Sequence, residues 1–192
     1  MKMQSIPLFL VLVLNIVSVY GCAGQTWSKN YALADGVEAN HPAIIDGDPE
    51  TIGQSQLIEN SGDSIRSYSA PSESVVLLPT PKSIHRVVIY SSNLEAFDLW
   101  TADAQGRWAK IEEVKSNTDA VVDLRLSQMV HTAGIKVRVR RTTEDAELRR
   151  KNVISGRRYR TYVGRTRGTA KIGEIELYGF ASADDTINSP TQ

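Results

Sequence analysis

From residue 75 to residue 180 the sequence repeatedly alternates apolar and polar residues with a period of two. A period of two places apolar side chains on one face of a strand and polar side chains on the other, as in antiparallel sheets with one solvated face. Turn-forming residues separate the alternating segments, so the pattern predicts an all-β fold, either a sandwich or a barrel. The expected strands cover residues 75–78, 84–90, 97–101, 108–114, 122–126, 135–139 and 172–180.

The remaining segments carry other signals. Residues 40–74 are rich in Gly, Pro, Ser, Asp and Asn, which predicts turns and irregular loops. Residues 143–151 allow at most a short helix. Residues 149–169 form a long basic insertion between two expected strands, and we expect either an extra hairpin or a flexible protruding loop there. The polar tail, residues 181–192, is expected to be disordered.

The N-terminus has the form of a secretory signal. Lys2 supplies the positive charge, Ile6–Val19 is an apolar segment too short to span a bilayer, and small residues follow. We therefore assign residues 1–21 to a signal peptide and residues 22–39 to a tether that leads into the fold. The mature chain is expected outside the cytoplasm.

Cys22 is the single cysteine of the chain, so no internal disulfide is available to it. The segment Val19-Tyr20-Gly21-Cys22 resembles a bacterial lipobox, which implies a lipid-modified cysteine and a membrane-anchored lipoprotein of the bacterial cell envelope. Ala23 stands where an inner-membrane retention signal would have Asp, which favours the outer membrane if the source has one. The alternative is ordinary signal cleavage nearby, with an incidental cysteine.

The charge balance restricts the partners. The formal net charge is +0, whereas a dedicated nucleic-acid-binding domain is normally basic, so we expect no nucleic-acid partner. The charges are unevenly spread: acids dominate residues 35–98, and residues 149–171 contain nine Lys or Arg and no acid.

Three segments in order resemble the galactose-binding-domain-like superfamily, the jelly-roll modules of the discoidin, coagulation-factor type C and carbohydrate-binding kind. They are the acidic turn Ala43–Thr51, the strand-turn-strand segment Phe97–Ile111 and the terminal strand Ile172–Gly179. The resemblance implies a jelly-roll β-sandwich over residues 40–180.

The resemblance also implies a structural calcium ion between the early turn and the last strand. Its ligands would come from Ala43, Asp46, Asp48, Thr51, Gly173 and Glu174. Calcium takes six to eight oxygen ligands and mixes carboxylates with main-chain carbonyls. The alternative is a plain acidic turn, since Asp and Gly are the usual turn-forming residues.

Candidate ligand-binding residues fall in two places. Trp100 points away from the face of Phe97 and Leu99, so it either stacks on a sugar ring or packs under the basic insertion. Trp108 occupies the position of a buried tryptophan in the resembled family, so we expect it in the core. The guanidinium groups of Arg157, Arg158 and Arg160 suit oxyanions, although a solvated loop is the alternative.

The sequence contains no catalytic motif that we recognise. Its histidines are scattered, and no metal-protease, nucleophile-elbow or phosphate-loop spacing occurs. We therefore expect a non-enzymatic, membrane-anchored binding module for a glycan or another cell-envelope component. The alternative is a structural envelope adaptor that holds a protein partner through residues 149–169.

Overall fold

The computed structural model describes residues 26–58, 68–155 and 160–181. The predicted signal peptide, Cys22 and residues 182–192 of the predicted tail lie outside these ranges. Within these ranges, no helix has the length and apolar character needed to cross a membrane.

The described chain consists mainly of antiparallel strands. The elements in order are η2 (Tyr31–Leu33), β1 (Glu38–Ala39), η3 (Pro42–Ile44), β2 (Gly53–Gln54), β3 (Gln56–Leu57), β4 (Ser72–Ser91), β5 (Leu94–Ala102), β6 (Trp108–Val114), β7 (Val121–Thr142), α3 (Asp145–Asn152), β8 (Val153–Ser155), β9 (Arg160–Tyr162) and β10 (Lys171–Tyr178). The main strand order is β2-β10-β4-β7-β5-β6, and β1 and β3 also pair with β4.

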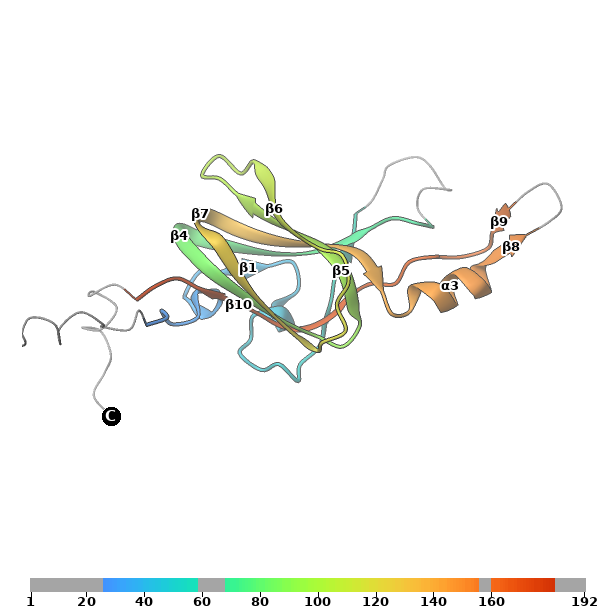
Figure 1. Ribbon diagram of the computed structural model, residues 1–192, viewed down its shortest axis with the longest axis horizontal. Coiled ribbons are helices and arrows are strands. Elements are labelled where there is room, and N and C mark those ends of the chain that lie inside the picture. Colours follow the sequence, from blue (N-terminus) through green and yellow to red (C-terminus); the bar gives the residue numbers. More distant parts are fainter. Residues whose placement is uncertain (1–25, 59–67, 156–159, 182–192) are drawn as a thin grey trace, which may run out of the picture.

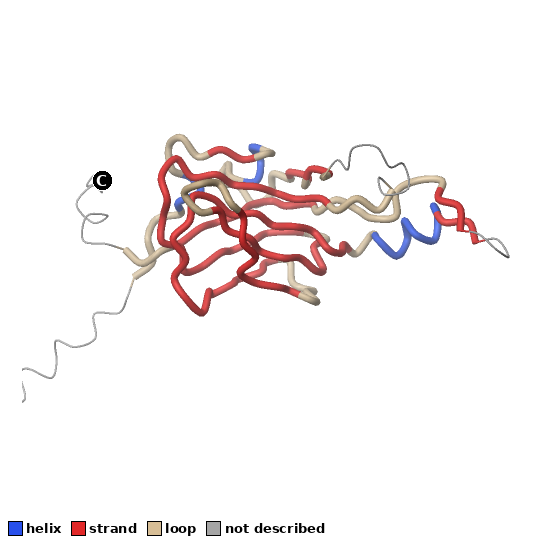
Figure 2. Tube along the Cα trace, turned by 90° about the horizontal axis from the view of Figure 1, so that it is seen from above, coloured by secondary structure: helices blue, strands red, loops and turns tan. Residues whose placement is uncertain are grey.

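Two long strands, β4 and β7, run through both layers of the molecule (Figures 1 and 2). Residues 72–77 of β4 pair with residues 134–139 of β7. Together with β5, β6, β1 and β3 they form one sheet, which we call the front sheet. Residues 82–90 of β4 pair with residues 121–132 of β7, and β10 and β2 complete the back sheet. The predicted jelly-roll β-sandwich is thereby confirmed.

The strands change sheet at a corner where their pairing is interrupted. The register shifts between Leu77 and Lys82 on β4, so Pro79 and Pro81 lie where no ladder hydrogen bond is required. The amides of Ala102 on β5 and Gly134 on β7 each donate to Thr132 Oγ1 at 3.1 Å. The same hydroxyl lies 2.7 Å from the Gly134 carbonyl oxygen, which it can donate to. One buried hydroxyl therefore satisfies backbone groups that the bend removes from the ladder.

The core fills the space between the two sheets. Fully buried apolar side chains come from the front sheet (Val76, Phe97, Leu99, Ile135, Val137) and from the back sheet (Ile84, Val87, Ile89, Ile175, Leu177). Burial of each such side chain stabilises the fold by about 1.5–3 kcal/mol. The residues between them, such as Arg138 and Glu176, lie on the outer faces, as the period of two predicted.

The basic insertion forms an arm made of α3, β8 and β9, which projects from one end of the sandwich (Figure 1). The β8–β9 hairpin is the first of the two alternatives considered for this segment. The helix begins with Asp145 and Glu147 and ends with basic residues, an arrangement that complements the helix dipole. At the base of the arm, the Thr166 amide donates to the Tyr68 carbonyl oxygen at 2.8 Å.

The two described ends of the chain pair with each other at the end of the sandwich opposite the arm (Figures 1 and 2). Trp27 and Phe180 form an antiparallel bridge, and their rings stack with centroids 5.1 Å apart. The Ser28 amide donates to the Gly179 carbonyl oxygen at 3.0 Å. The segment that follows the predicted lipidation site therefore joins the sandwich beside the last strand.

We expect Thr132→Val to destabilise the protein. The substitution keeps the side-chain shape but leaves the buried Ala102 and Gly134 amides without their acceptor, at a cost of about 1–3 kcal/mol each. Urea unfolding followed by circular dichroism measures the loss. Thr161→Val, at an exposed position of β9, is the matched control. Equal stability of the two variants would contradict the role of this hydroxyl.

Candidate functional site

The outer face of the front sheet carries a cluster of aromatic and charged side chains. Trp100 on β5 lies directly opposite Lys136 on β7, while their neighbours Leu99 and Val137 point into the core. The same alternation places Arg138 on the outer face beside Lys136. The strand register thus brings these side chains together on the surface.

The Lys136 ammonium lies close to two indole rings. Its Nζ is 4.4 Å from the centroid of the Trp108 ring and 5.6 Å from that of Trp100. The ammonium is also 3.7 Å from Glu73 Oε2, and the residue is only 9% exposed. Cation–π contacts of this kind contribute about 0.5–2 kcal/mol, more where water is excluded. The lysine is therefore held in one position rather than extended into solvent.

A hollow of about 540 Å³ lies beside this cluster, and we call it the tryptophan hollow. Its apolar wall includes Val75, Leu77 and Trp108, and its polar groups include Glu73 and Lys136. Small-molecule sites typically enclose about 300–1,000 Å³ and combine an apolar wall with a few placed polar groups. The tryptophan hollow has both properties.

Three polar atoms of the same cluster lack a hydrogen-bond partner among the described residues. They are Trp100 Nε1, Arg138 Nε and Glu73 Oε2, of which the last two form an ion pair at 3.7 Å that is too long for a hydrogen bond. Buried polar groups without a partner cost about 1–3 kcal/mol each, so such groups are normally satisfied by ordered water or by a ligand. The cluster therefore has unused hydrogen-bonding capacity next to the hollow.

The prediction that Trp108 belongs to the core is wrong. Trp108 pairs with Ala102 at the start of β6 and is not part of the core, whereas Ile111 packs against the core. The side chain is half-buried and lines the tryptophan hollow. A signal was present in the sequence, because Trp108 and the apolar Ile111 are three residues apart and a period of two puts them on opposite faces.

The acidic turn and the last strand meet at the edge of the back sheet. The Gly47 amide donates to Glu174 Oε2 at 3.0 Å, although 127 positions separate the two residues. A side chain at Gly173 would lie 2.0 Å from the Pro49 carbonyl oxygen, so the close approach requires glycine. Within the turn, Asp46 Oδ1 accepts from the Asp48 amide at 2.9 Å. These are the segments that the resemblance places around calcium.

Glu174 is the unusual group of this edge. The residue is 1% exposed, and its Oε1 has no hydrogen-bond partner among the described residues. Burial raises the pKa of its carboxyl to about 7 against the lowering effect of the Gly47 amide, and the Asp46 carboxylate adds to the rise. A cation at this position would offset both the burial and the repulsion.

The other residues expected at this edge are differently placed. Asp48 is engaged in the turn, where its carboxylate accepts from the Glu50 amide at 3.0 Å and from Thr51 Oγ1 at 3.5 Å. Ala43 lies half-buried in η3. The described residues contain no group of three or more His, Cys, Asp or Glu arranged to hold a metal. Most oxygen ligands of a calcium ion here would therefore be carbonyl groups and water.

Comparison with solved structures places this architecture among known folds. A family 32 carbohydrate-binding module from Clostridium perfringens NanJ, solved with galactose, matches with a TM-score of 0.52 and 14% sequence identity over 80% of this chain and 100% of the module. A chitosan-binding module of a Paenibacillus chitosanase/glucanase matches with a TM-score of 0.52 and 13% identity over 79% of this chain and 99% of the module. The sixth family 32 module of a second C. perfringens protein gives a TM-score of 0.51 and 14% identity over 78% and 98%.

The chain has the same fold as these carbohydrate-binding modules, a jelly-roll β-sandwich. No family model and no curated protein sequence matches the chain. The likeness therefore lies in the fold, and the ligand-contacting surface has to be argued from this chain's own residues.

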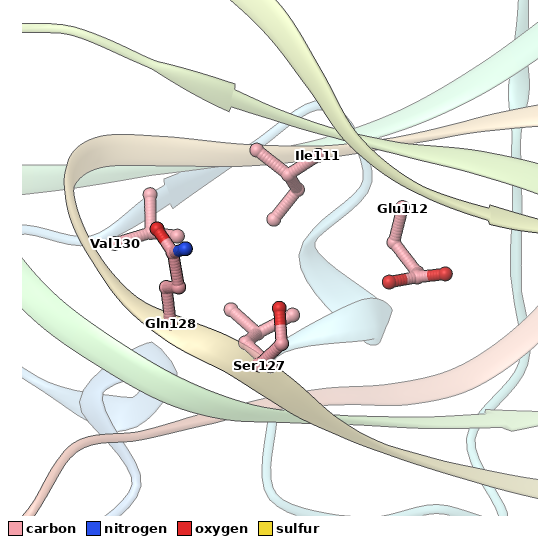
Figure 3. Close-up of a pocket in the computed structure, with 6 residues that line it drawn as sticks. Ile111, Glu112, Ser127, Gln128 and Val130 are labelled. Carbon is pink, nitrogen blue, oxygen red and sulfur yellow. The ribbon is translucent and has the colours of Figure 1, made fainter.

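The sandwich has a further cavity beside β6 (Figure 3). Ile111 of β6 and Ser127, Gln128 and Val130 of β7 line it, and its volume is about 160 Å³. The cavity lies where β6 of the front sheet faces the first half of β7 in the back sheet. Its volume is below the usual range for a ligand site, so the tryptophan hollow is the better candidate.

The arm carries the remaining predicted ligand-binding residues. Arg160 is exposed on β9, whereas Arg157 and Arg158 lie outside the described residues. Arg149 and Arg150 on α3 are exposed and line hollows at the arm. The sequence predicted binding residues at the tip of the insertion. The structure shows further exposed arginines on the helix that leads to the tip.

Proposed function

We propose that this protein is a binding module that takes up a glycan at the tryptophan hollow. The observation that carries the proposal is the pairing of the Trp108 indole with Lys136 and Glu73 around a hollow of about 540 Å³. The fold supports the proposal, because structural neighbours were solved with galactose and with chitotriose. The second of these, another Paenibacillus chitosan-binding module, has a TM-score of 0.50.

The proposed contacts follow from the chemistry of sugars. The apolar face of a sugar ring packs on the Trp108 indole, which offers a large flat surface at a low entropy cost. Ring hydroxyls accept from Lys136 and donate to Glu73. Trp100 lies next to this arrangement, because both Lys136 and Arg138 lie over its ring.

The proposed location is the bacterial cell envelope, with Cys22 lipidated and the outer membrane favoured. Thr26, the first described residue, is four positions beyond Cys22, and four residues span at most about 14 Å. The end of the sandwich with Trp27 and Phe180 would then face the membrane. The arm, at the opposite end, would point away from it.

Calcium at the edge of the back sheet is part of the same proposal. Glu174 and Asp46 would supply carboxylate oxygens, and Gly173, Ala43 and Thr51 would supply the neighbouring oxygens. The buried, unpartnered Oε1 of Glu174 supports this assignment. A bound ion would tie the acidic turn to β10 and so stabilise the fold.

A structural envelope adaptor is the second candidate function. The observation that favours it is the arm, whose exposed Arg149, Arg150 and Arg160 project beyond the sandwich. Charge reversal at Arg157, Arg158 and Arg160 should abolish capture of an envelope protein by an adaptor. A glycan-binding module should lose no glycan affinity on the same changes.

Trp108→Ala should weaken glycan binding by about thirty-fold. Loss of a central aromatic anchor costs about 2 kcal/mol, which corresponds to that factor in affinity. Trp100→Ala should weaken binding less, since Trp100 acts through Lys136 and Arg138. A glycan array identifies the ligand, and titration calorimetry measures the affinities. Trp27→Ala, remote from the hollow, is the control, and equal affinity of Trp108→Ala and the control would contradict the proposed site.

Calcium binding should raise the melting temperature of the wild-type protein relative to protein in excess chelator. Glu174→Gln should melt at least as high as wild type in chelator, because no buried charge remains, and should lose the calcium-dependent rise. Glu38→Gln, at an exposed position of β1, is the matched control. If the wild-type protein melts at the same temperature with calcium and with chelator, the protein does not bind a stabilising calcium ion.

Cys22→Ser should release the protein from the membrane fraction of the producing bacterium. The substitution removes the only thiol that can carry the lipid. Cell fractionation and immunoblotting follow the distribution. Unchanged membrane association of the serine variant would show that another feature of the chain is responsible.

A further inference from the structure

A second hollow lies where the base of the arm meets the front sheet, and its lining is strongly basic. We call it the arginine hollow; its volume is about 560 Å³. The charged residues that line it are Glu113, Lys115, Arg140, Arg141, Arg149 and Arg167. Five cations therefore surround one acid.

Part of this positive charge is balanced within the protein. Arg140 pairs with Glu113 and lies 3.4 Å from Asp98, and Arg141 Nε is 2.7 Å from Glu95 Oε2. These pairs account for two of the five cations.

Of the other three cations, one has only a long ion pair and two have none within the described ranges. Arg149 comes no closer than 3.8 Å to Asp145, and neither Lys115 nor Arg167 has an ion-pair partner within the described ranges. The hollow thus keeps unneutralised positive charge.

Local structure brings these side chains to one place. The register of β5 with β7 shifts between Ala96 and Phe97, so Arg140 and Arg141 are both exposed although they are consecutive. Arg149 lies in the last turn of α3, which starts directly after β7. The basic residues of the hollow therefore come from the sheet, the helix and the returning chain.

The returning chain is firmly held next to Arg167. The buried Asp145 accepts from Thr142 Oγ1 at 2.7 Å and from the Gly168 amide at 2.9 Å. The Thr166 amide, on the other side of Arg167, donates to Tyr68. Both neighbours of Arg167 are thus fixed, so the backbone that carries its side chain is in place before any ligand arrives. A preorganised site loses less conformational entropy on binding.

We propose that the arginine hollow binds the carboxylate or sulfate group of an acidic polysaccharide that also occupies the tryptophan hollow. Guanidinium groups bind such oxyanions through two parallel hydrogen bonds, which suits Arg149 and Arg167. The proposal rests on the glycan function proposed above and names the class of glycan.

The two hollows lie along the same strand. Lys136 lines the tryptophan hollow and Arg140 the arginine hollow, and four residues of a strand span about 13 Å. Arg138 lies on the same face between them. A short oligosaccharide is long enough to contact both hollows.

The test compares two probes that differ in charge: an oligogalacturonate and a galacto-oligosaccharide of the same length. Calorimetry of the full mature chain should show tighter binding of the acidic probe, and its affinity should fall as salt is raised. The double variant Arg149→Gln/Arg167→Gln should lose about tenfold or more in affinity for the acidic probe and less than about twofold for the neutral one. Arg125→Gln, an exposed arginine on the outer face of the back sheet, is the matched control.

Inorganic sulfate provides a second measurement that needs no glycan. Its titration should shift the side-chain Nε–H resonances of Arg149 and Arg167 in NMR spectra, and the double variant should show no such saturable shift. Equal acidic-probe affinity of the double variant and Arg125→Gln would overturn the inference. The inference would also be overturned if Arg149 and Arg167 were required for capture of an envelope protein but not for binding of the acidic glycan.

The outcomes separate this inference from the proposed function. Loss of neutral binding on Trp108→Ala with no effect of the double variant overturns the anionic site and leaves the glycan function standing. Loss of acidic binding on the double variant with no effect of Trp108→Ala supports the anionic site but overturns the tryptophan hollow as the glycan site, and with it the proposal that one polysaccharide occupies both hollows.

Discussion

The sandwich depends on the pairing of β4 with β7, the two strands shared by both sheets. Their pairing continues on either side of a corner where Thr132 satisfies the amides of Ala102 and Gly134. Without that corner, the two sheets would have no common strands and their apolar faces would not oppose each other. The tryptophan hollow and the arginine hollow both take their position from this one change of sheet.

The same strands place apolar side chains in the core and charged side chains on the surface. The second half of β7 turns Ile135, Val137 and Val139 inward and turns Lys136 and Arg138 outward. The inner set builds the core, and the outer set meets tryptophans and acids from neighbouring strands. Core packing and the candidate binding face are thus two sides of one period-two pattern, so a register slip of one residue would destroy both.

The fold class could be predicted from the sequence, but the arrangement of side chains on the surfaces could not. Alternation in residues 122–139 predicted strands and their inner faces, but two separate strands were expected where β7 is continuous. The continuity could not be predicted, because it depends on Thr132 reaching Ala102 across the sheet. Pro79 and Pro81 likewise read as a break, yet they lie within β4 at the interrupted part of the ladder.

The candidate sites were likewise predicted only in part from the sequence. The acidic turn and Glu174 were recognised by resemblance to a known family, and the structure brings them into contact. Trp108 was expected in the core by resemblance, although its spacing from the inward-facing Ile111 predicts the opposite face of the strand. The arginine hollow was not foreseen, since its residues come from β6, β7, α3 and the segment before β10. Such a site exists only after the strand register and the arm are set.

The pairing of Trp27 with Phe180 makes the described chain nearly a closed ring. Thr26 and Ala181 are joined by a backbone hydrogen bond of 2.9 Å, so a few added residues would connect them without disturbing either sheet. Circular permutation is tolerated where the joined ends lie this close, so a permutant could link Thr26 to Ala181 in place of the flanking segments. New ends could then be opened at the exposed turn between β5 and β6, and the order of strands in space would be unchanged while their order in sequence was rotated.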